Sequence, residues 1–91
     1  MALFYASVPQ SAAMATPRLL LYQRDDCHLC DLALEVLAAA RAPDFESVFI
    51  DDDAVLEGRY GTRVPVLRDD ARGVELAWPF DADRLRLFLG V

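Results

Sequence analysis

Residues 18–50 have the sequence RLLLYQRDDCHLCDLALEVLAAARAPDFESVFI, which predicts a strand, a helix and a second strand in succession. The run at 18–23 is short and mostly apolar, as in a strand that is buried on both faces. From Leu29 onward, apolar side chains recur at i+3, i+4, i+7 and i+8, which is the spacing of one helix face. Pro43 ends that helix, and residues 45–50 are rich in aromatic and β-branched side chains, which favours a strand.

The rest of the chain predicts a short helix, a hairpin and a final helix. The acids at 51–53 suit the start of a helix that Gly61 ends. Residues 64–68 and 74–77 are predicted strands joined by a polar turn, and Asp81 suits the N-cap of the last helix. The order is therefore β-α-β-(α)-β-β-α. Because a crossover helix joins parallel strands and a tight turn joins antiparallel ones, we expect an α/β protein with a mixed four-stranded sheet and helices on both faces.

The length and composition restrict the class of protein. At 91 residues we expect one domain, folded over residues 17–91, with residues 1–16 as a flexible N-terminal tail that fits a secretory leader poorly. Nine arginines, no lysines and a net charge of -6 argue against a nucleic-acid surface. No apolar run reaches the ~18–20 residues that cross a bilayer. A single cysteine pair suits a reducing compartment, so we expect a cytoplasmic monomer that binds neither nucleic acid nor membrane.

Cys27 and Cys30 are the only cysteines, and they stand where the first strand gives way to the first helix. Side chains at i and i+3 of a helix have Cβ atoms ~5–6 Å apart, whereas a disulfide needs roughly 3.5–4.5 Å, so a bridge can form under some tension. Strain raises the reduction potential of a bridge, and its place at a helix start admits a partner thiol. The pair is therefore a candidate redox centre.

The whole pattern resembles the thioredoxin fold, and within it the glutaredoxin branch, in particular small bacterial glutaredoxin-like proteins. The likeness rests on LLLYQRDDCHLCDLA at 19–33, on YGTRVPVL at 60–67 and on Phe80-Asp81 before the last helix. It covers essentially all of residues 18–90. A lone CxxC would be weak evidence, but one in this context is a more specific signal.

The resemblance implies a thiol–disulfide oxidoreductase. Cys27 would be the exposed nucleophile and Cys30 the resolving thiol, and the N–H groups at a helix start favour a thiolate at Cys27 independently of the family. The resemblance also implies that Pro65 follows a cis peptide bond and faces the disulfide, while Val64 offers its backbone to a substrate strand. Such a protein acts on protein or glutathione disulfides without a bound cofactor, and glutathione is its candidate co-substrate.

Several ionisable side chains are placed to tune the thiolate. His28 stands between the cysteines, where typical glutaredoxins carry Pro-Tyr; it either favours the thiolate when charged or is a solvated helix residue. Asp25 and Asp26, at ~7 Å, each disfavour the thiolate by roughly 0.6–1 kcal/mol. The helix terminus and Arg24 favour it by ~1–2 kcal/mol. These effects nearly cancel, so we expect Cys27 to ionise near neutral pH.

For glutathione recognition the resemblance implies three contacts, with departures at two of them. Arg24 matches a basic residue three positions before the first cysteine. Arg63 replaces a threonine, and AWP at 77–79 stands where glycines would allow close backbone approach. Asp81 remains as an acceptor for an amino group. Arg24, Arg59 and Arg63 can pair bidentately with carboxylates, or they are solvated surface cations.

Two other functions stay open. The first is an iron–sulfur or metal carrier in which thiolates of two chains, or Cys27 with glutathione, hold a cluster. We predict no metal site within the monomer, because two cysteines and one histidine fall short of the four ligands of a closed zinc site and the acids at 51–53 suit capping. The second is a non-catalytic binding module in which the bridge is a staple. We favour catalysis, because the apolar pattern already supplies a core without the bridge.

Overall fold

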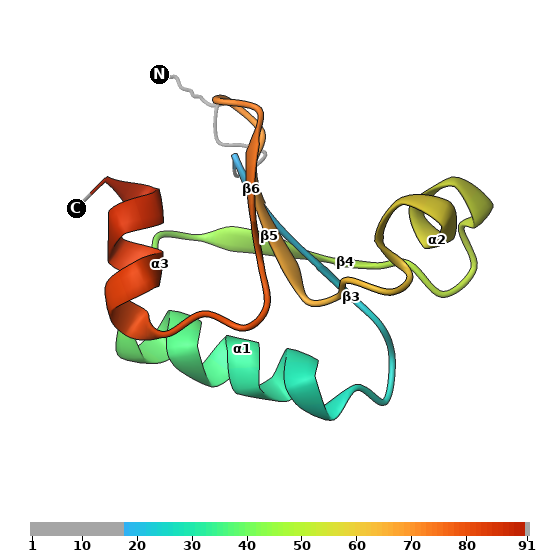
Figure 1. Ribbon diagram of the computed structural model, residues 1–91, viewed down its shortest axis with the longest axis horizontal. Helices are drawn as coiled ribbons and strands as arrows, with labels where there is room; N and C mark the ends of the chain where they lie inside the picture. Colours follow the sequence, from blue (N-terminus) through green and yellow to red (C-terminus); the bar gives the residue numbers. More distant parts are fainter. Residues whose placement is uncertain (1–17, 91) are drawn as a thin grey trace, which may run out of the picture.

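The computed structural model describes residues 18–90, so the predicted tail at 1–16 lies outside the described part of the chain. The elements are β3 (Leu19–Gln23), α1 (His28–Ala39), β4 (Phe45–Phe49), α2 (Ala54–Tyr60), β5 (Val66–Asp69), β6 (Val74–Ala77) and α3 (Ala82–Leu89) (Figure 1). They form a four-stranded sheet of order β4-β3-β5-β6. β3 is parallel to β4 and antiparallel to β5, and β5 is antiparallel to β6. The predicted element order and mixed sheet are confirmed.

Helices cover both faces of the sheet, as predicted. Figure 1 shows α1 and α3 together on one side and α2 on the other. Side chains alternate along β3, because successive residues of a strand point to opposite faces. Leu19 and Leu21 therefore enter the core beneath α1 and α3, whereas Tyr22 enters the smaller core beneath α2. None of the helices that the structure describes is long and apolar enough to cross a membrane.

The helix ends follow the capping residues that the sequence offers. Asp53 caps α2, since its carboxylate accepts the N–H groups of Val55 and Leu56 at 3.0 and 3.1 Å. Asp81 caps α3 by accepting the N–H of Arg84 at 2.8 Å. These two carboxylates satisfy N–H groups that would otherwise lack a partner in the first turn. The capping predictions for both helices are confirmed.

The third strand begins two residues later than the sequence suggested. β5 starts at Val66, so Val64 and Pro65 lie just before it, and the Val64–Pro65 peptide bond is cis as expected. A second cis bond joins Trp78 and Pro79, which the sequence analysis did not predict. The Trp78 N–H donates to the Pro65 carbonyl at 3.0 Å. This bond joins the two proline segments beyond the paired part of β5 and β6.

A buried carboxylate holds the hairpin turn that was predicted only as polar. The Asp69 side chain is 0% exposed and lies 2.7 Å from Nε of Arg72 and 3.2 Å from the guanidinium of Arg18. The Ala71 N–H donates to the same carboxylate at 3.1 Å. Arg72 also donates to the Phe88 carbonyl. Arg72 therefore links the turn to the end of α3, and its partner within the turn is the fully buried carboxylate of Asp69.

Candidate active site

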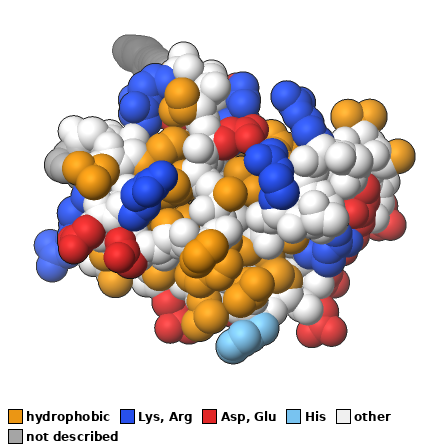
Figure 2. Space-filling model, viewed as in Figure 1, with side chains coloured by type: hydrophobic (Ala, Val, Ile, Leu, Met, Phe, Trp, Pro, Cys, Tyr) orange, Lys and Arg blue, Asp and Glu red, His pale blue; other side chains and the backbone are white. Residues whose placement is uncertain are grey.

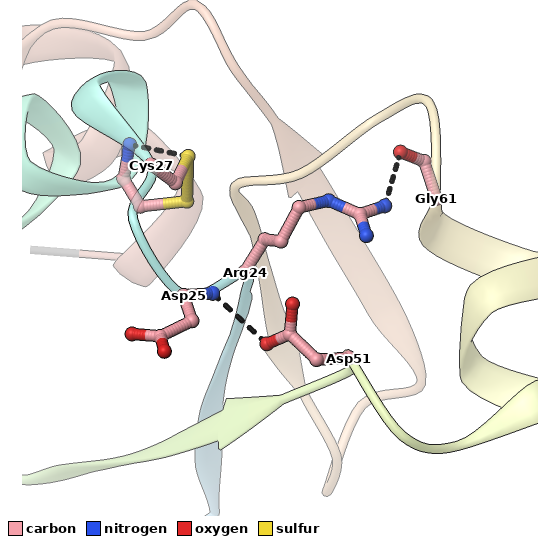
Figure 3. The surroundings of a disulfide bond; sticks show 6 residues. Arg24, Asp25, Cys27, Asp51 and Gly61 are labelled. Atoms are coloured by element: carbon pink, nitrogen blue, oxygen red, sulfur yellow. Dashed lines mark hydrogen bonds between the residues drawn. A yellow bond between two sulfur atoms is a disulfide. The ribbon is translucent and has the colours of Figure 1, made fainter.

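Cys27 is the N-cap of α1, and Cys30 lies in the first turn of that helix. The Cα atoms are 5.2 Å apart and the two sulfurs form a disulfide (Figure 3). The Cys27 backbone is extended, with φ -118° and ψ 109°, and its Sγ accepts the Cys30 N–H at 3.1 Å. An N–H in this position normally donates to a side-chain oxygen of Ser, Thr or Asp at the N-cap. A sulfur here occupies the position where the positive end of the helix favours an anion.

The two sulfurs differ in accessibility. Cys30 is 1% exposed, whereas Cys27 is half-buried at the surface. Between them, His28 is exposed and Leu29 is 45% exposed. In Figure 2 the chain's one histidine, in pale blue, lies at the edge of the molecule beside a group of hydrophobic side chains. A partner sulfur can therefore approach Cys27 more easily than Cys30, which is the asymmetry that the implied roles require.

Arg24 is held by Glu57, a partner that the sequence analysis missed. Its Nη1 and Nη2 donate to the two carboxylate oxygens of Glu57 at 2.6 and 2.8 Å, and Nη2 also donates to the Gly61 carbonyl at 2.9 Å. This hydrogen-bonded pair lowers the pKa of Glu57 and raises that of Arg24. In Figure 3 the Arg24 side chain points away from the disulfide and toward Gly61. The two partners are 33 residues apart, so no local pattern reveals them.

Carboxylates surround the loop that precedes Cys27. The Asp25 N–H donates to Asp51 Oδ2 at 2.9 Å, which joins this loop to the one after β4 (Figure 3). Asp26 adopts a positive φ of 53° in the same tight turn. Asp25 also lines an open depression of about 680 Å³. The other lining residues are Phe49, Asp51, Asp52 and Asp53. Asp25, one of the two aspartates predicted to tune the thiolate, therefore lies in the same depression as Asp51, Asp52 and Asp53. Of these three acids, Asp53 is the one that caps α2.

The backbone of Val64 is only partly free. Its N–H donates to the Tyr60 carbonyl at 3.0 Å, so the carbonyl is the group left to pair with a substrate strand. Pro65 is fully buried, and its own carbonyl accepts the Trp78 N–H. The proposed backbone contact at Val64 therefore has one hydrogen bond to offer where a free strand edge would have two.

The other residues implied in glutathione binding have partners within the fold. Arg63 lies 3.2 Å from Glu75, with its guanidinium carbon 5.2 Å from the centre of the Tyr60 ring, and Arg59 lies over the same ring at 5.8 Å. Asp81 is engaged as the cap of α3. These contacts are compatible with surface packing, and glutathione binding by these side chains stays a prediction.

Tyr60 is the centre of a polar cluster beneath α2. Its ring stacks on Tyr22 at 4.2 Å, and its hydroxyl donates to Glu75 at 2.6 Å. Burial, together with the neighbouring Glu75 carboxylate, raises the pKa of Tyr60 to about 12.

Within residues 18–90, no group of three or more His, Cys, Asp or Glu side chains is placed to hold a metal ion.

Comparisons with known proteins agree with this architecture. Residues 18–90 match the model of a glutaredoxin-like domain family (DUF836). The chain is similar to protein XcR50 from X. campestris, whose X-ray structure is 71% identical, covers 79% of this chain and 95% of its own, and has a TM-score of 0.76. The solution structure of XcR50 gives 70% identity, 80% and 92% coverage and a TM-score of 0.75.

A more distant protein has the same fold. Protein Ne2328 from Nitrosomonas europaea is 26% identical, covers 87% of this chain and 98% of its own, and has a TM-score of 0.67 in its solution structure. A comparison with curated proteins found no match. Neither XcR50 nor Ne2328 is named for an activity. The reaction is therefore inferred from the cysteine site itself.

Proposed function

This chain belongs to the glutaredoxin-like domain family, and on that premise we propose that it is a thiol–disulfide oxidoreductase acting through Cys27 and Cys30. The observation that supports the proposal most is the arrangement of the two sulfurs. Cys27 is accessible at the helix N-cap with a backbone N–H donated to its sulfur, and Cys30 is buried one turn away at bonding distance. Thiol–disulfide exchange requires this pairing of an attacking thiolate with a shielded resolving thiol.

Reduction of a substrate disulfide would proceed in two exchanges. The Cys27 thiolate attacks one sulfur of R–S–S–R′, forms a Cys27–S–S–R bond and expels R′S⁻, which takes up a proton. Cys30 then gives up its proton, and its thiolate attacks Cys27 Sγ and expels RS⁻, which is protonated in turn. Two electrons pass from the dithiol to the substrate, and the chain ends in the disulfide state that the structure shows. An external dithiol, or two monothiols such as glutathione, reduces the bridge again.

The surroundings of Cys27 supply the conditions for attack. The Cys30 N–H lies 3.1 Å from the Cys27 sulfur, and the N-terminus of a helix stabilises an adjacent anion by typically 0.3–1 kcal/mol. The same donor stabilises Cys27 as a leaving group when Cys30 attacks. The Val64 carbonyl beside the buried Pro65 is the proposed contact for the substrate backbone. None of these steps needs a bound cofactor.

A Cys27→Ser variant tests this function. Serine keeps an oxygen at the N-cap, so the variant should fold, but it lacks the nucleophile. The reduced full-length chain is mixed with hydroxyethyl disulfide, and the loss of protein thiols is followed with time. Wild type should lose both thiols together, and Cys27→Ser should react slower by at least about two orders of magnitude.

A second measurement, reduction of the oxidised chain, separates an oxidoreductase from a binding module with a structural disulfide. A bridge that millimolar thiol reduces while the fold persists supports an exchange site. If the bridge resists the thiol and the chain unfolds on forced reduction, the bridge is a staple and the proposal is wrong. Equal thiol loss in wild type and Cys27→Ser would also count against it.

A further inference from the structure

We infer that this site selects against anionic disulfides, oxidised glutathione among them, and that Glu57 sets the selectivity by occupying Arg24. The inference rests on the proposed function and names the substrate class of the same site. That class is a disulfide whose flanking groups are neutral or positively charged. Three observations carry it: the bidentate pairing of Arg24 with Glu57, the space that Gly61 leaves for Glu57, and the acids around the β3–α1 loop.

Arg24 is the cation closest to Cys27 in the sequence, and the fork of its two terminal nitrogens is already occupied. Both carboxylate oxygens of Glu57 lie within 2.8 Å of its terminal nitrogens, and the Gly61 carbonyl lies 2.9 Å from one of them. A guanidinium binds a carboxylate through this same fork. A carboxylate of a ligand would therefore have to displace Glu57 before it could form the same bidentate pair with Arg24.

Gly61 makes the arrangement specific. Its φ of -51° is accessible to any residue, so backbone freedom does not explain the glycine. A Cβ at this position would lie 2.5 Å from the Glu57 carbonyl oxygen and 2.9 Å from its Oε1. The missing side chain thus leaves room for the Glu57 carboxylate, while the Gly61 carbonyl accepts a bond from Arg24. The last turn of α2 and its C-cap therefore both contribute to binding the Arg24 guanidinium.

With Arg24 neutralised, the charge close to the site is negative. Asp25 and Asp26 directly precede Cys27, and Asp25 lines the same depression as Asp51, Asp52 and Asp53. The depression also contains Phe49, which is 53% exposed and offers an apolar contact. An anionic disulfide approaching Cys27 meets uncompensated repulsion, whereas a cationic one is attracted. Substrate charge should therefore control the rate of the first exchange.

A series of small disulfides of different charge measures this selectivity. The reduced full-length chain reacts with cystamine, which is cationic, with hydroxyethyl disulfide, which is neutral, and with dithiodiglycolate, which is anionic. Each rate constant is divided by that of mercaptoethanol with the same disulfide, measured under the same conditions at about pH 8. After this correction, cystamine should react at least about fivefold faster than dithiodiglycolate at low salt, and about 0.5 M salt should reduce the spread.

Variants of the pair locate the cause. Glu57→Gln keeps the shape and leaves the positive charge of Arg24 uncompensated, so it should raise the ratio of dithiodiglycolate to cystamine rates by about three- to tenfold. Arg24→Gln leaves Glu57 unpaired and should lower that ratio, and the double variant should return to within about twofold of wild type. Asp44→Asn is the matched control for loss of one negative charge. It precedes β4 at the far end of the sheet, where Phe45 pairs with Leu19, and should leave the ratio within about 1.5-fold.

The outcomes separate this inference from the proposed function. If wild type reacts with all three disulfides but shows no charge preference, or if Glu57→Gln leaves the ratio unchanged, the selectivity inference is wrong and the oxidoreductase proposal stands. If none of the disulfides reacts, the proposed function itself fails. If Glu57→Gln does not fold, the salt dependence of wild type decides: opposite slopes for cystamine and dithiodiglycolate support the inference, and parallel slopes overturn it.

Discussion

Arg24 and Cys27 are close in the sequence, yet the guanidinium of Arg24 points away from the disulfide (Figure 3). A cation three residues before the nucleophile suggests direct stabilisation of a thiolate. The charge of Arg24 is instead compensated by the Glu57 carboxylate, which binds it through both oxygens. A thiolate at Cys27 would therefore be stabilised mainly by the Cys30 N–H and by the N-terminus of α1. At the scale of single residues, Glu57 offsets the charge of Arg24, the basic residue nearest Cys27 in the sequence.

Asp69 is a fully buried carboxylate whose loss should cost stability. Burial alone would raise its pKa, but hydrogen bonds from Arg72 and the charge of Arg18 outweigh this and lower the pKa below its ordinary value. The ionised carboxylate therefore stabilises the fold above about pH 4, and this contribution is lost as the pH falls through the lowered pKa. Asp69→Asn should cost about 2–4 kcal/mol at pH 7, and the difference from wild type should shrink toward pH 2–3.

Urea unfolding at pH 7 and at acid pH measures both effects. Asp70→Asn is the control, because the neighbouring Asp70 side chain is 61% exposed and pairs with Arg68 at the surface. That variant should cost less than about 1 kcal/mol. Equal losses for the two variants, or a cost of Asp69→Asn that does not change with pH, would contradict the assigned role of Asp69.

Tyr60 provides a test at alkaline pH. Its pKa is raised to about 12, because the ring is buried and the hydroxyl donates to Glu75. A raised pKa means that stability is fully present below the unfolded value of about 10 and is lost as the pH rises toward 12. Wild type should therefore lose stability over this window, and Tyr60→Phe should lose less. Denaturant unfolding at pH 9 and 11.5 checks this, with Tyr22→Phe as the control that keeps the Tyr60–Glu75 bond.

At the scale of elements, α2 and its C-cap contain two glycines with opposite requirements. A Cβ at Gly58 would meet nothing within 4 Å, whereas a Cβ at Gly61 would collide with the Glu57 carbonyl. Gly58→Ala should therefore stabilise the chain by about 0.5–1 kcal/mol through helix propensity. Gly61→Ala should destabilise it by about 1–3 kcal/mol through crowding. Thermal unfolding of the two variants compares them, and a stabilising Gly61→Ala would contradict the crowding of position 61 against Glu57.

The elements themselves follow from local patterns. The helical spacing from Leu29 and the caps at Asp53 and Asp81 place the three helices to within a few residues, because periodicity and capping act over one or two turns. The start of β5 was predicted two residues early, since the sequence around Pro65 is as β-like before the strand as within it. The cis bond at Trp78–Pro79 was missed because no motif accompanied it.

At the scale of the whole molecule, sequence reasoning missed contacts that join segments far apart in the chain. Arg24 and Glu57 are 33 residues apart, and the contact of Arg72 with Phe88 spans 16 residues. Such pairs appear only after the sheet brings separate segments together, whereas the CxxC site is contained within one strand–helix junction. The sequence therefore predicts where the two sulfurs lie but not what neutralises the cation near them.

Attack by the Cys27 sulfur is the step on which the proposed function and the inferred selectivity depend, and the most direct measurement compares formation of the first mixed disulfide on each sulfur alone. The full-length Cys30→Ser and Cys27→Ser variants, each with one cysteine, are reduced, exposed to hydroxyethyl disulfide and followed with time by mass spectrometry. The predicted result is rapid formation of a stable adduct of one substrate half on Cys27, released by added thiol, with little adduct on Cys30 over the same time. Equal rates of adduct formation on the two sulfurs, or no adduct on Cys27 under conditions in which wild type loses both thiols, would contradict attack by Cys27.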